Sequence, residues 1–429
     1  MRRTCRCFLT LIAAVVLAAG TARADEITDW NTTMLRAALV GGTSPLVLTR
    51  VAAIVHSAVF DAANGISRRY TPIHVAPAGP ADASRDAAAV QAAYATLLQL
   101  YPTQKPFLDA RLAVSLAVLA THESSAAIAS GRTWGQTVAD AILAWRSTDG
   151  FTPAPAPFLG GTAPGQWRPT PPALLPGAGP QFAYMTPWAI LSPSQFHPAG
   201  PPALTSAKYA VDFNETKTMG SATSATRTPD QTVASWFWAS GTASYIWNTV
   251  AASLIDRSDR DDDSDHEGHG RHRHSSLDNA RLLAMMNVAM ADAAIGCWEA
   301  KYSFTFWRPV TAIPLAATDG NPATTEEPAW TPLFATPNHP EYPSGHSCVS
   351  GAAGAVLADS FGDKTHFSAE SDLMPGVVRS FKSFSSALQE VKDARIFAGI
   401  HFRAATDDGQ TIGASVAEYV LDHTAQPAH

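Results

Sequence analysis

Apolar residues recur along most of the chain at the three- and four-residue spacing of helices that bury one face. Alanine, the best helix former, is abundant in these stretches, and alternating runs of β-branched residues are scarce. This pattern predicts an all-α protein. The predicted helices cover residues 51–64, 86–100, 105–120, 124–147, 206–218, 230–255, 276–301, 347–361, 383–402 and 407–423.

Two segments interrupt the helical pattern. Residues 151–202 are rich in proline and glycine, with large aromatic residues interspersed: Phe158, Trp167, Trp188 and Phe196. A loop this long is uncommon in a compact domain unless it is functional, so it either helps to wall a site or is a structural wrap without substrate contact. Residues 256–276 are rich in aspartate and histidine. Glycine and alternating charge there favour a solvated, disordered insertion over a metal site, because nothing in it can bury a core.

The first 24 residues are typical of a secretory signal peptide. Three arginines precede an apolar stretch over residues 8–19, and Ala22-Arg23-Ala24 stands before the acidic Asp25. We therefore expect a secreted or periplasmic protein whose mature chain begins near Asp25. The expected organisation is a signal peptide over 1–24, an N-terminal helical part over 25–255, the insertion over 256–276 and a C-terminal helical part over 277–429.

Composition narrows the classes of partner. The chain has 429 residues, of which 46% are hydrophobic, so it can bury a large core in one big domain or two smaller ones. A net charge of −7 gives no reason to expect nucleic acid or anionic membranes as partners. After the signal peptide we expect no bilayer-spanning segment, and an oligomer is compatible with the sequence. Cys297 and Cys348 remain in the mature chain and are expected to be buried thiols, with a disulfide between them as the alternative.

Three short segments near the C-terminus carry the most specific chemistry. They are KYSFTFWRP over residues 301–309, PSGH over 343–346 and RIFAGIH over 395–401. Their lysine and two arginines, together with backbone amides beside a glycine, are the donors that hold a tetrahedral oxyanion in a dry pocket. Their two histidines add a ligand or nucleophile and a proton carrier.

The spacing within the first two segments supports this interpretation. A separation of seven places Lys301 and Arg308 on nearly the same helix face, while the proline at 309 takes Arg308 out of helical geometry. The PSGH segment precedes a small-residue helix, which directs free amides and the positive end of a helix dipole toward an anion.

The third segment does not fit one straight helix. Arg395 and His401 are roughly 120° out of phase on an ideal helix, so either Gly399 bends the chain or the long arginine side chain reaches round. Each segment alone also fits a surface helix, a turn or a core histidine, and His56 on the first predicted helix is interpreted as structural. All three segments together, in order, indicate an oxyanion site.

At these residues the chain resembles the vanadium-dependent haloperoxidases and the acid phosphatases of the type 2 phosphatidic acid phosphatase superfamily. Their shared signature is K-x6-R-P, then P-S-G-H, then S-R-x5-H. The resemblance implies a large helical domain built from two four-helix-bundle-like halves. Two positions depart from the pattern: Ala394 replaces the serine, and Ala405 stands where many members have an aspartate that orients the second histidine. Asp407 or Asp408 would have to take over that role, or it is absent.

The resemblance implies two enzyme functions. In a haloperoxidase, neutral His401 is the axial ligand to vanadium, His346 moves protons, Lys301 polarises bound peroxide, and vanadate is held by Lys301, Arg308, Ser344, Gly345 and Arg395. The substrates are hydrogen peroxide, a halide and an organic acceptor. In a phosphatase the same cage holds a phosphoryl group, His401 attacks phosphorus and His346 protonates the leaving alcohol. A secreted protein that binds an oxyanion without chemistry is a third hypothesis.

The surroundings of the motifs favour the haloperoxidase. Trp298 and the FTFWRP and RIFAGIHFR strings resemble the haloperoxidase forms of the first and third segments. His339 occupies a place where chloride-oxidising relatives tend to have phenylalanine and bromide-oxidising relatives histidine, which favours bromide or iodide. Plain packing beside the site is the alternative for both residues. The missing aspartate after His401 argues against a standard phosphatase, in which the nucleophilic histidine needs a fixed tautomer.

Overall fold

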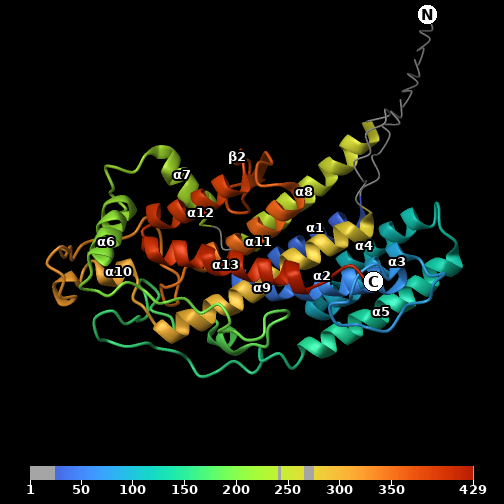
Figure 1. Cartoon of the computed structure of the whole chain (residues 1–429), viewed down its shortest axis with the longest axis horizontal. Coiled ribbons are helices and arrows are strands. Elements are labelled where there is room, and N and C mark those ends of the chain that lie inside the picture. Colours follow the sequence, from blue (N-terminus) through green and yellow to red (C-terminus); the bar gives the residue numbers. More distant parts are fainter. Residues whose placement is uncertain (1–24, 240–242, 265–274, 429) are drawn as a thin grey trace, which may run out of the picture.

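The structure, a computed structural model, describes residues 25–239, 243–264 and 275–428. The predicted signal peptide and residues 265–274, which carry the histidines of the predicted insertion, lie outside these residues. Within the described part, helices dominate and the strands are limited to one short hairpin, which confirms the all-α prediction. Figure 1 shows an elongated molecule, with α3, α4 and α5 at one end and α6 and α10 at the other.

The N-terminal helices form one group. They are α1 (Glu26–Val40), α2 (Pro45–Ser67), α3 (Arg85–Leu100), α4 (Lys105–Leu119) and α5 (Ser125–Arg146). Several begin where a polar side chain accepts an N–H that has no intrahelical partner; Ser84 caps α3 in this way and Ser124 caps α5. Helix α3 packs against both α2 and α5. Of this group, α1 lies outside the predicted helices.

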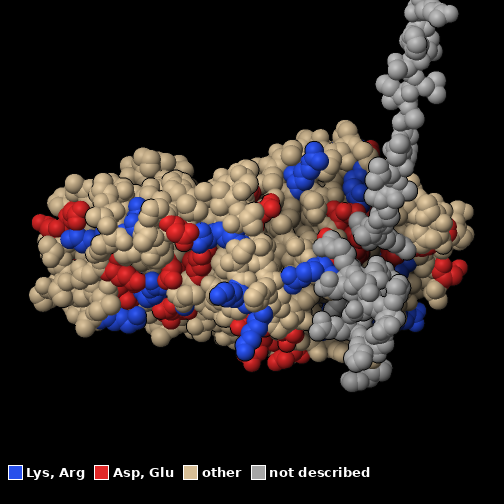
Figure 2. Space-filling model, turned by 90° about the horizontal axis from the view of Figure 1, so that it is seen from above, with Lys and Arg blue, Asp and Glu red and all other residues tan. Residues whose placement is uncertain are grey.

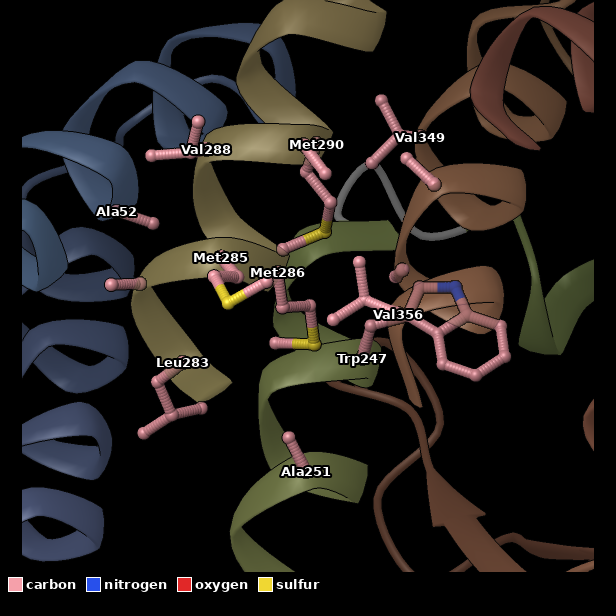
Figure 3. Packing of buried hydrophobic residues seen from close by; sticks show 14 of the residues in the cluster. Ala52, Trp247, Ala251, Leu283, Met285, Met286, Val288, Met290, Val349 and Val356 are labelled. Atoms are coloured by element: carbon pink, nitrogen blue, oxygen red, sulfur yellow. The ribbon is translucent and has the colours of Figure 1, made fainter. Parts of the chain in front are cut away.

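A second group surrounds the long helix α9 (Ser276–Phe304). It consists of α8 (Ala243–Ser264), α11 (Gly345–Phe361), α12 (Phe384–Phe397) and α13 (Arg403–His423). Figure 3 shows Met285, Met286 and Met290 of α9 among Ala52 of α2, Trp247 of α8 and valines of α11. Because α9 contacts α2 on one side and both α11 and α13 on another, its core residues join the two groups.

Two helices in the described part are long and apolar enough to cross a membrane by length and composition, where we expected none. They are α2 and α9, and 83% and 89% of their most apolar windows are buried inside the protein. Their apolar surface is therefore satisfied by other helices. On the face drawn in Figure 2, basic and acidic side chains are interspersed over the described residues, as on an ordinary solvated surface.

The remaining elements are short. They are η1 (Pro102–Gln104), η2 (Pro180–Tyr184), α6 (Ala207–Gly220), α7 (Pro229–Phe237), α10 (Pro309–Ala312), η3 (Ala316–Thr318), β1 (Phe367–Glu370) and β2 (Val378–Phe381). The two strands pair antiparallel. The predicted helix over 230–255 is divided between α7 and α8, and α8 continues to Ser264, into the predicted insertion. Once a helix has formed, each further residue adds a hydrogen bond at little entropic cost, which explains such an extension.

The Pro/Gly-rich segment over 151–202 is held against α9 by a buried carboxylate. Asp292 accepts hydrogen bonds from the backbone N–H groups of Trp188 (2.7 Å), Ala189 (2.7 Å) and Ile190 (3.0 Å). The guanidinium of Arg146 lies over the Trp188 ring, 3.6 Å from its centroid. These contacts fix the segment that carries η2, and η2 contributes to the cavity described below.

Candidate active site

The three predicted segments meet at the ends of helices. Lys301 lies in the last turn of α9, Arg308 directly precedes α10, Ser344 is the N-cap of α11, and Arg395 lies in the last turn of α12. His401 lies between α12 and α13. All five side chains are buried, at 2% exposure or less.

A glycine explains how Arg395 and His401 reach the same site although they would not share a face of one straight helix. Gly399 has φ of +74°, a conformation that glycine adopts without the steric penalty of a Cβ. Helix α12 ends at Phe397, so Arg395 and His401 are not on one helix and both reach the same site. Of the two alternatives left open by the sequence, a bend at Gly399 is the one that the structure shows. Arg308 is extended, with φ of −84° and ψ of 155°, as predicted from the proline that follows it.

Two of the cations are anchored by main-chain carbonyls. Lys301 Nζ donates to the carbonyls of Pro340 (2.9 Å), Glu341 (3.1 Å) and Pro343. Arg308 Nε donates to the His339 carbonyl at 2.9 Å, and its Nη1 donates to the Ile400 carbonyl at 2.7 Å. Because an ammonium has three N–H donors, the bonds of Lys301 occupy all of them. Lys301 therefore holds the chain segment before PSGH and adds positive charge to the site.

The site carries more positive than negative charge. Burial lowers the pKa of Lys301 to about 8, of Arg308 to about 10 and of Arg395 to about 9. The carboxylate beside them is Glu341, whose pKa burial raises to about 7. Buried charges are costly unless they are paired, so three cations around one carboxylate favour the binding of an anion.

Several polar atoms among these residues have no protein partner. Ser344 Oγ and Arg395 Nε are buried without a hydrogen bond in the described part of the chain. Ser344 gives α11 no side-chain cap, and the first N–H groups of a helix have no partner within it. A Cβ on Gly345 would lie 2.9 Å from the Trp298 ring, so glycine is what allows the backbone to approach here. This donor set fits a tetrahedral oxyanion such as vanadate or phosphate.

Glu341 orients His401, whereas the sequence pattern had pointed to Asp407 or Asp408 for this role. Glu341 Oε1 accepts hydrogen bonds from His401 Nδ1 and from the backbone N–H of Phe402, both at 2.9 Å. On the other side of the ring, Arg308 Nη1 lies 3.0 Å from His401 Nε2. Arginine has only donors, so Nε2 accepts and the ring proton is on Nδ1. Burial and the nearby cations lower the pKa of His401 well below its usual value. His401 is therefore neutral, with the lone pair of Nε2 facing the cations.

The proposed replacements for the missing aspartate were wrong. Asp407 pairs with Lys392 at 3.0 Å, and Asp408 accepts a 2.6 Å hydrogen bond from the Tyr342 hydroxyl. The main chain turns at Gly399 before His401, so the ring faces the segment before PSGH and not the first turn of α13. A carboxylate three residues before Ser344 was visible in the sequence, but only the fold shows that it reaches His401.

Two substitutions of Glu341 distinguish the effect of its hydrogen bonds from the effect of its negative charge. In Glu341→Gln the amide oxygen can still accept both hydrogen bonds, whereas in Glu341→Leu both donors lose their partner. We expect Glu341→Leu to lower affinity for an oxyanion that binds through His401 by roughly 10- to 100-fold, as when the partner of a metal-ligating histidine is removed. Glu341→Gln should lose less. Titration of both variants with vanadate tests this; equal affinities in wild type and Glu341→Leu would contradict it.

Trp298 and His339, the two residues predicted to surround the motifs, also lie at the site. His339 Nδ1 is 2.9 Å from Arg308 Nη2, and the His339 ring is 5.1 Å from the Trp298 ring. Burial and two neighbouring cations lower the pKa of His339 well below its usual value. Trp298 Nε1 donates to the Ala178 carbonyl at 3.0 Å, which ties α9 to the Pro/Gly-rich segment.

A cavity of about 450 Å³ opens beside these residues. His339, His346, Arg395 and His401 line one part of it, and Ala178 to Phe182 of the Pro/Gly-rich segment line another. His346 lies in the first turn of α11. The structure thus brings together all the predicted site residues, and it places part of the long loop at the cavity wall.

The residues expected to be structural are packed away from the cavity lining. Cys297 and Cys348 are free and buried, which confirms the prediction of buried thiols. Cys297 Sγ lies 3.7 Å from the Pro343 carbonyl oxygen. His56 is 1% exposed, and its Nε2 lies 3.0 Å from Asn31 Oδ1.

Part of the chain is similar in sequence to known proteins. The family model for the VCPO second helical-bundle domain matches residues 281–429. Vanadium chloroperoxidase from Curvularia inaequalis is 31% identical over 179 residues, covering 36% of this chain and 28% of that relative. The chain thus spans less than a third of the length of this relative.

Solved structures match over nearly the whole chain. The crystal structure described as the first bacterial vanadium-dependent iodoperoxidase has a TM-score of 0.77 at 26% identity, covering 95% of this chain and 98% of that one. The holo-type bacterial vanadium-dependent chloroperoxidase has a TM-score of 0.67 at 16% identity, covering 88% of this chain and 91% of that one, which shows a shared fold.

Proposed function

We propose that this chain is a vanadium-dependent haloperoxidase and that it uses hydrogen peroxide to oxidise bromide or iodide to hypohalous acid. The observation that carries the proposal is the state of His401. Its Nδ1–H is held by Glu341, and its Nε2 lone pair faces a buried group of cations. That is the arrangement a metal-ligating imidazole requires.

The residues of the cage fit vanadate. Arg308, Arg395, Ser344 and the amide of Gly345 would hold its oxygens, and His401 Nε2 would be the ligand to vanadium. Bound vanadate supplies a Lewis acid that activates peroxide toward attack by a halide. Lys301 contributes positive charge to the cage. For its ammonium also to polarise peroxide, it would exchange one of its three carbonyl hydrogen bonds for one to the substrate.

The residues around the cage would carry protons, and their burial limits screening by water. His346 lies at the cavity wall within the first turn of α11, where it can carry a proton between the cage and the cavity. Burial and the nearby cations lower the pKa of His401, so its imidazole stays neutral and does not take up a proton itself. The buried position of the cations strengthens their effect on an anion, because screening by water is weak there.

A phosphatase is the second candidate. The absence of an aspartate after His401 counted against it, but Glu341 fixes the same histidine tautomer, so that argument no longer separates the two functions. What favours the haloperoxidase is that the family model and the relatives described above are haloperoxidases. The third hypothesis, a binding protein without chemistry, has no observation of its own in its favour.

One experiment distinguishes the three hypotheses. Purified protein, stripped of bound oxyanion, is divided into two samples, and one is incubated with orthovanadate. We expect peroxide-dependent oxidation of iodide and bromide in the vanadate-loaded sample only, and little hydrolysis of a phosphate ester in the other. Rapid ester hydrolysis without halide oxidation would establish the phosphatase, and neither activity would establish the binding protein.

His339 is the residue proposed to set the choice of halide. Its imidazole accepts from Arg308 and lies beside the Trp298 ring at the cavity. A phenyl ring there would remove a polar partner and make the site more apolar. We expect the wild type to oxidise iodide and bromide but chloride poorly, and His339→Phe to shift the ratio toward chloride. Turnover of the three halides at matched vanadium content measures this, and an unchanged ratio would assign His339 to packing alone.

A further inference from the structure

A second cavity lies at the other end of α9 from the cage. It has about 360 Å³, within the range of about 300–1,000 Å³ that is typical of sites for small organic ligands. Arg281 in the second turn of α9 and Asp359 in the last turn of α11 line it, whereas the cage lies at the end of α9 and the start of α11. Lys301 follows Arg281 by 20 residues, which span about 30 Å of α-helix. The two sites are therefore separate.

Part of the lining of this second cavity is apolar. Four parts of the chain contribute to it: residues 69–70 directly after α2, and the helices α9, α11 and α13. Met285 and Val356, which Figure 3 labels, belong to the main core cluster, as does Leu282. Leu421 of α13 adds a further apolar side chain. A ligand with an apolar group would gain free energy by burying it against these side chains.

Two charged groups at this cavity have no charged partner in the protein. Arg281 Nε donates to the Ala425 carbonyl at 2.8 Å, and its guanidinium lies 4.8 Å from the centroid of the Tyr70 ring. Within the described part of the chain, the two Nη groups of Arg281 form no hydrogen bond or ion pair. The exposed carboxylate of Asp359 likewise has no hydrogen bond or ion pair with a described residue. Both groups are therefore available to a ligand.

The other two charged residues of the lining are already paired. Arg69 and Asp278 form an ion pair at 3.3 Å, and Asp278 also accepts a 2.7 Å hydrogen bond from the Tyr70 hydroxyl. The cavity thus offers one available guanidinium and one available carboxylate. A ligand with a single charge would pair with only one of them, whereas a zwitterion can pair with both. Residues in the last turns of α11 and α13 line the cavity, and the negative ends of these helix dipoles favour an ammonium group beside Asp359.

We propose that this second cavity binds an apolar α-amino acid as its zwitterion. The carboxylate of the ligand accepts from the Nη groups of Arg281, because a guanidinium presents its donors in a planar fork that matches a carboxylate. The ammonium of the ligand pairs with Asp359, and its side chain packs on Leu282, Met285 and Val356. Because the cavity is separate from the cage, this inference does not depend on the proposed haloperoxidase function.

L-Leucine is the probe, and three analogues each lack one part of it. 4-Methylpentanoate lacks the ammonium, 3-methylbutylamine lacks the carboxylate, and glycine lacks the side chain. Binding of each compound to the full-chain protein is measured by calorimetry. We expect saturable binding of L-leucine, and binding that is weaker by about tenfold or more for each analogue, because each loses a charged contact or the apolar contact. Absence of saturable binding at millimolar L-leucine would overturn the proposal, and so would equal affinity for 4-methylpentanoate.

Two variants test the charged contacts. Asp359→Asn replaces an exposed side chain and leaves the core unchanged, and Arg281→Met keeps an unbranched side chain but removes the guanidinium donors. Both should bind L-leucine about tenfold more weakly than the wild type or worse. Glu418→Gln is the matched control, because Glu418 is an exposed carboxylate of α13 outside the cavity lining. It should bind L-leucine as the wild type does. Equal affinity in Asp359→Asn and Glu418→Gln would overturn the proposal, even if Arg281→Met failed to fold.

Discussion

Arg395→Ala is expected to lower vanadate affinity by about 2–5 kcal/mol, roughly 30-fold to several thousand-fold. Arg395 is 1% exposed, its Nη1 donates to the Trp238 carbonyl at 2.6 Å, and its buried Nε has no partner in the described part of the chain. That unpaired donor is what a bound oxyanion would satisfy. The measurement is the vanadate concentration that restores half of the halide oxidation after the protein has been stripped of oxyanion.

Arg379→Ala is the matched control for this change. Arg379 is also largely buried, but it pairs with Glu390 at 2.7 Å and with Asp230 at 3.0 Å, and it is not among the residues that line the cavity. Its loss should alter stability without altering the vanadate titration. If Arg395→Ala and Arg379→Ala required the same vanadate concentration as the wild type, Arg395 would have no part in holding the anion.

His401→Ala is expected to abolish halide oxidation while the fold remains intact. His401 is the imidazole whose Nε2 lone pair faces the cations and accepts from Arg308, so the variant removes the proposed ligand to vanadium and leaves Arg308 and Arg395 in place. We therefore expect weaker retention of vanadate, with residual binding to the arginines. Steady-state iodide oxidation at saturating vanadate, with circular dichroism to check the fold, measures both parts of this prediction.

His423→Ala controls for the loss of a histidine as such, because His423 is exposed at the end of α13. It should behave as the wild type. A folded His401→Ala protein that kept vanadate-dependent oxidation of iodide would remove His401 from the role of ligand.

Local sequence signals were sufficient to predict most of the helices. The start of α9 at Ser276 and the end of α13 at His423 agree with the predicted bounds, because caps and apolar periodicity are local properties. The pairing of β1 with β2 depends on contacts with residues outside the two strands, such as the packing of Phe367 on Phe384. A pattern along the chain does not contain those contacts.

The cage could be predicted because its residues occur in three spaced motifs, and the fold brings all of them to helix ends. Two of its features could not. The hydrogen bond from His401 to Glu341 joins residues 60 positions apart and depends on the turn at Gly399. The three carbonyl partners of Lys301 depend on the path of the chain before Ser344. Both are contacts between residues far apart in the sequence, and both depend on the path of the backbone. Neither alters which residues the three motifs identify.

The cage contains more buried positive than negative charge. Main-chain carbonyls bind Lys301 and Arg308 but carry no full negative charge, so the cage remains cationic without a ligand. A bound oxyanion should therefore stabilise the folded state as well as enable chemistry, since a ligand that binds only the native protein shifts unfolding by mass action.

Equilibrium dialysis of the stripped protein against vanadate, with and without phosphate, measures directly whether the cage binds this anion. We expect saturable binding of one vanadate per chain that millimolar phosphate displaces, because the two anions have the same shape and share one set of donors. Vanadate binding that is absent, or that is indifferent to millimolar phosphate, would contradict the assignment of this cage as the vanadate site.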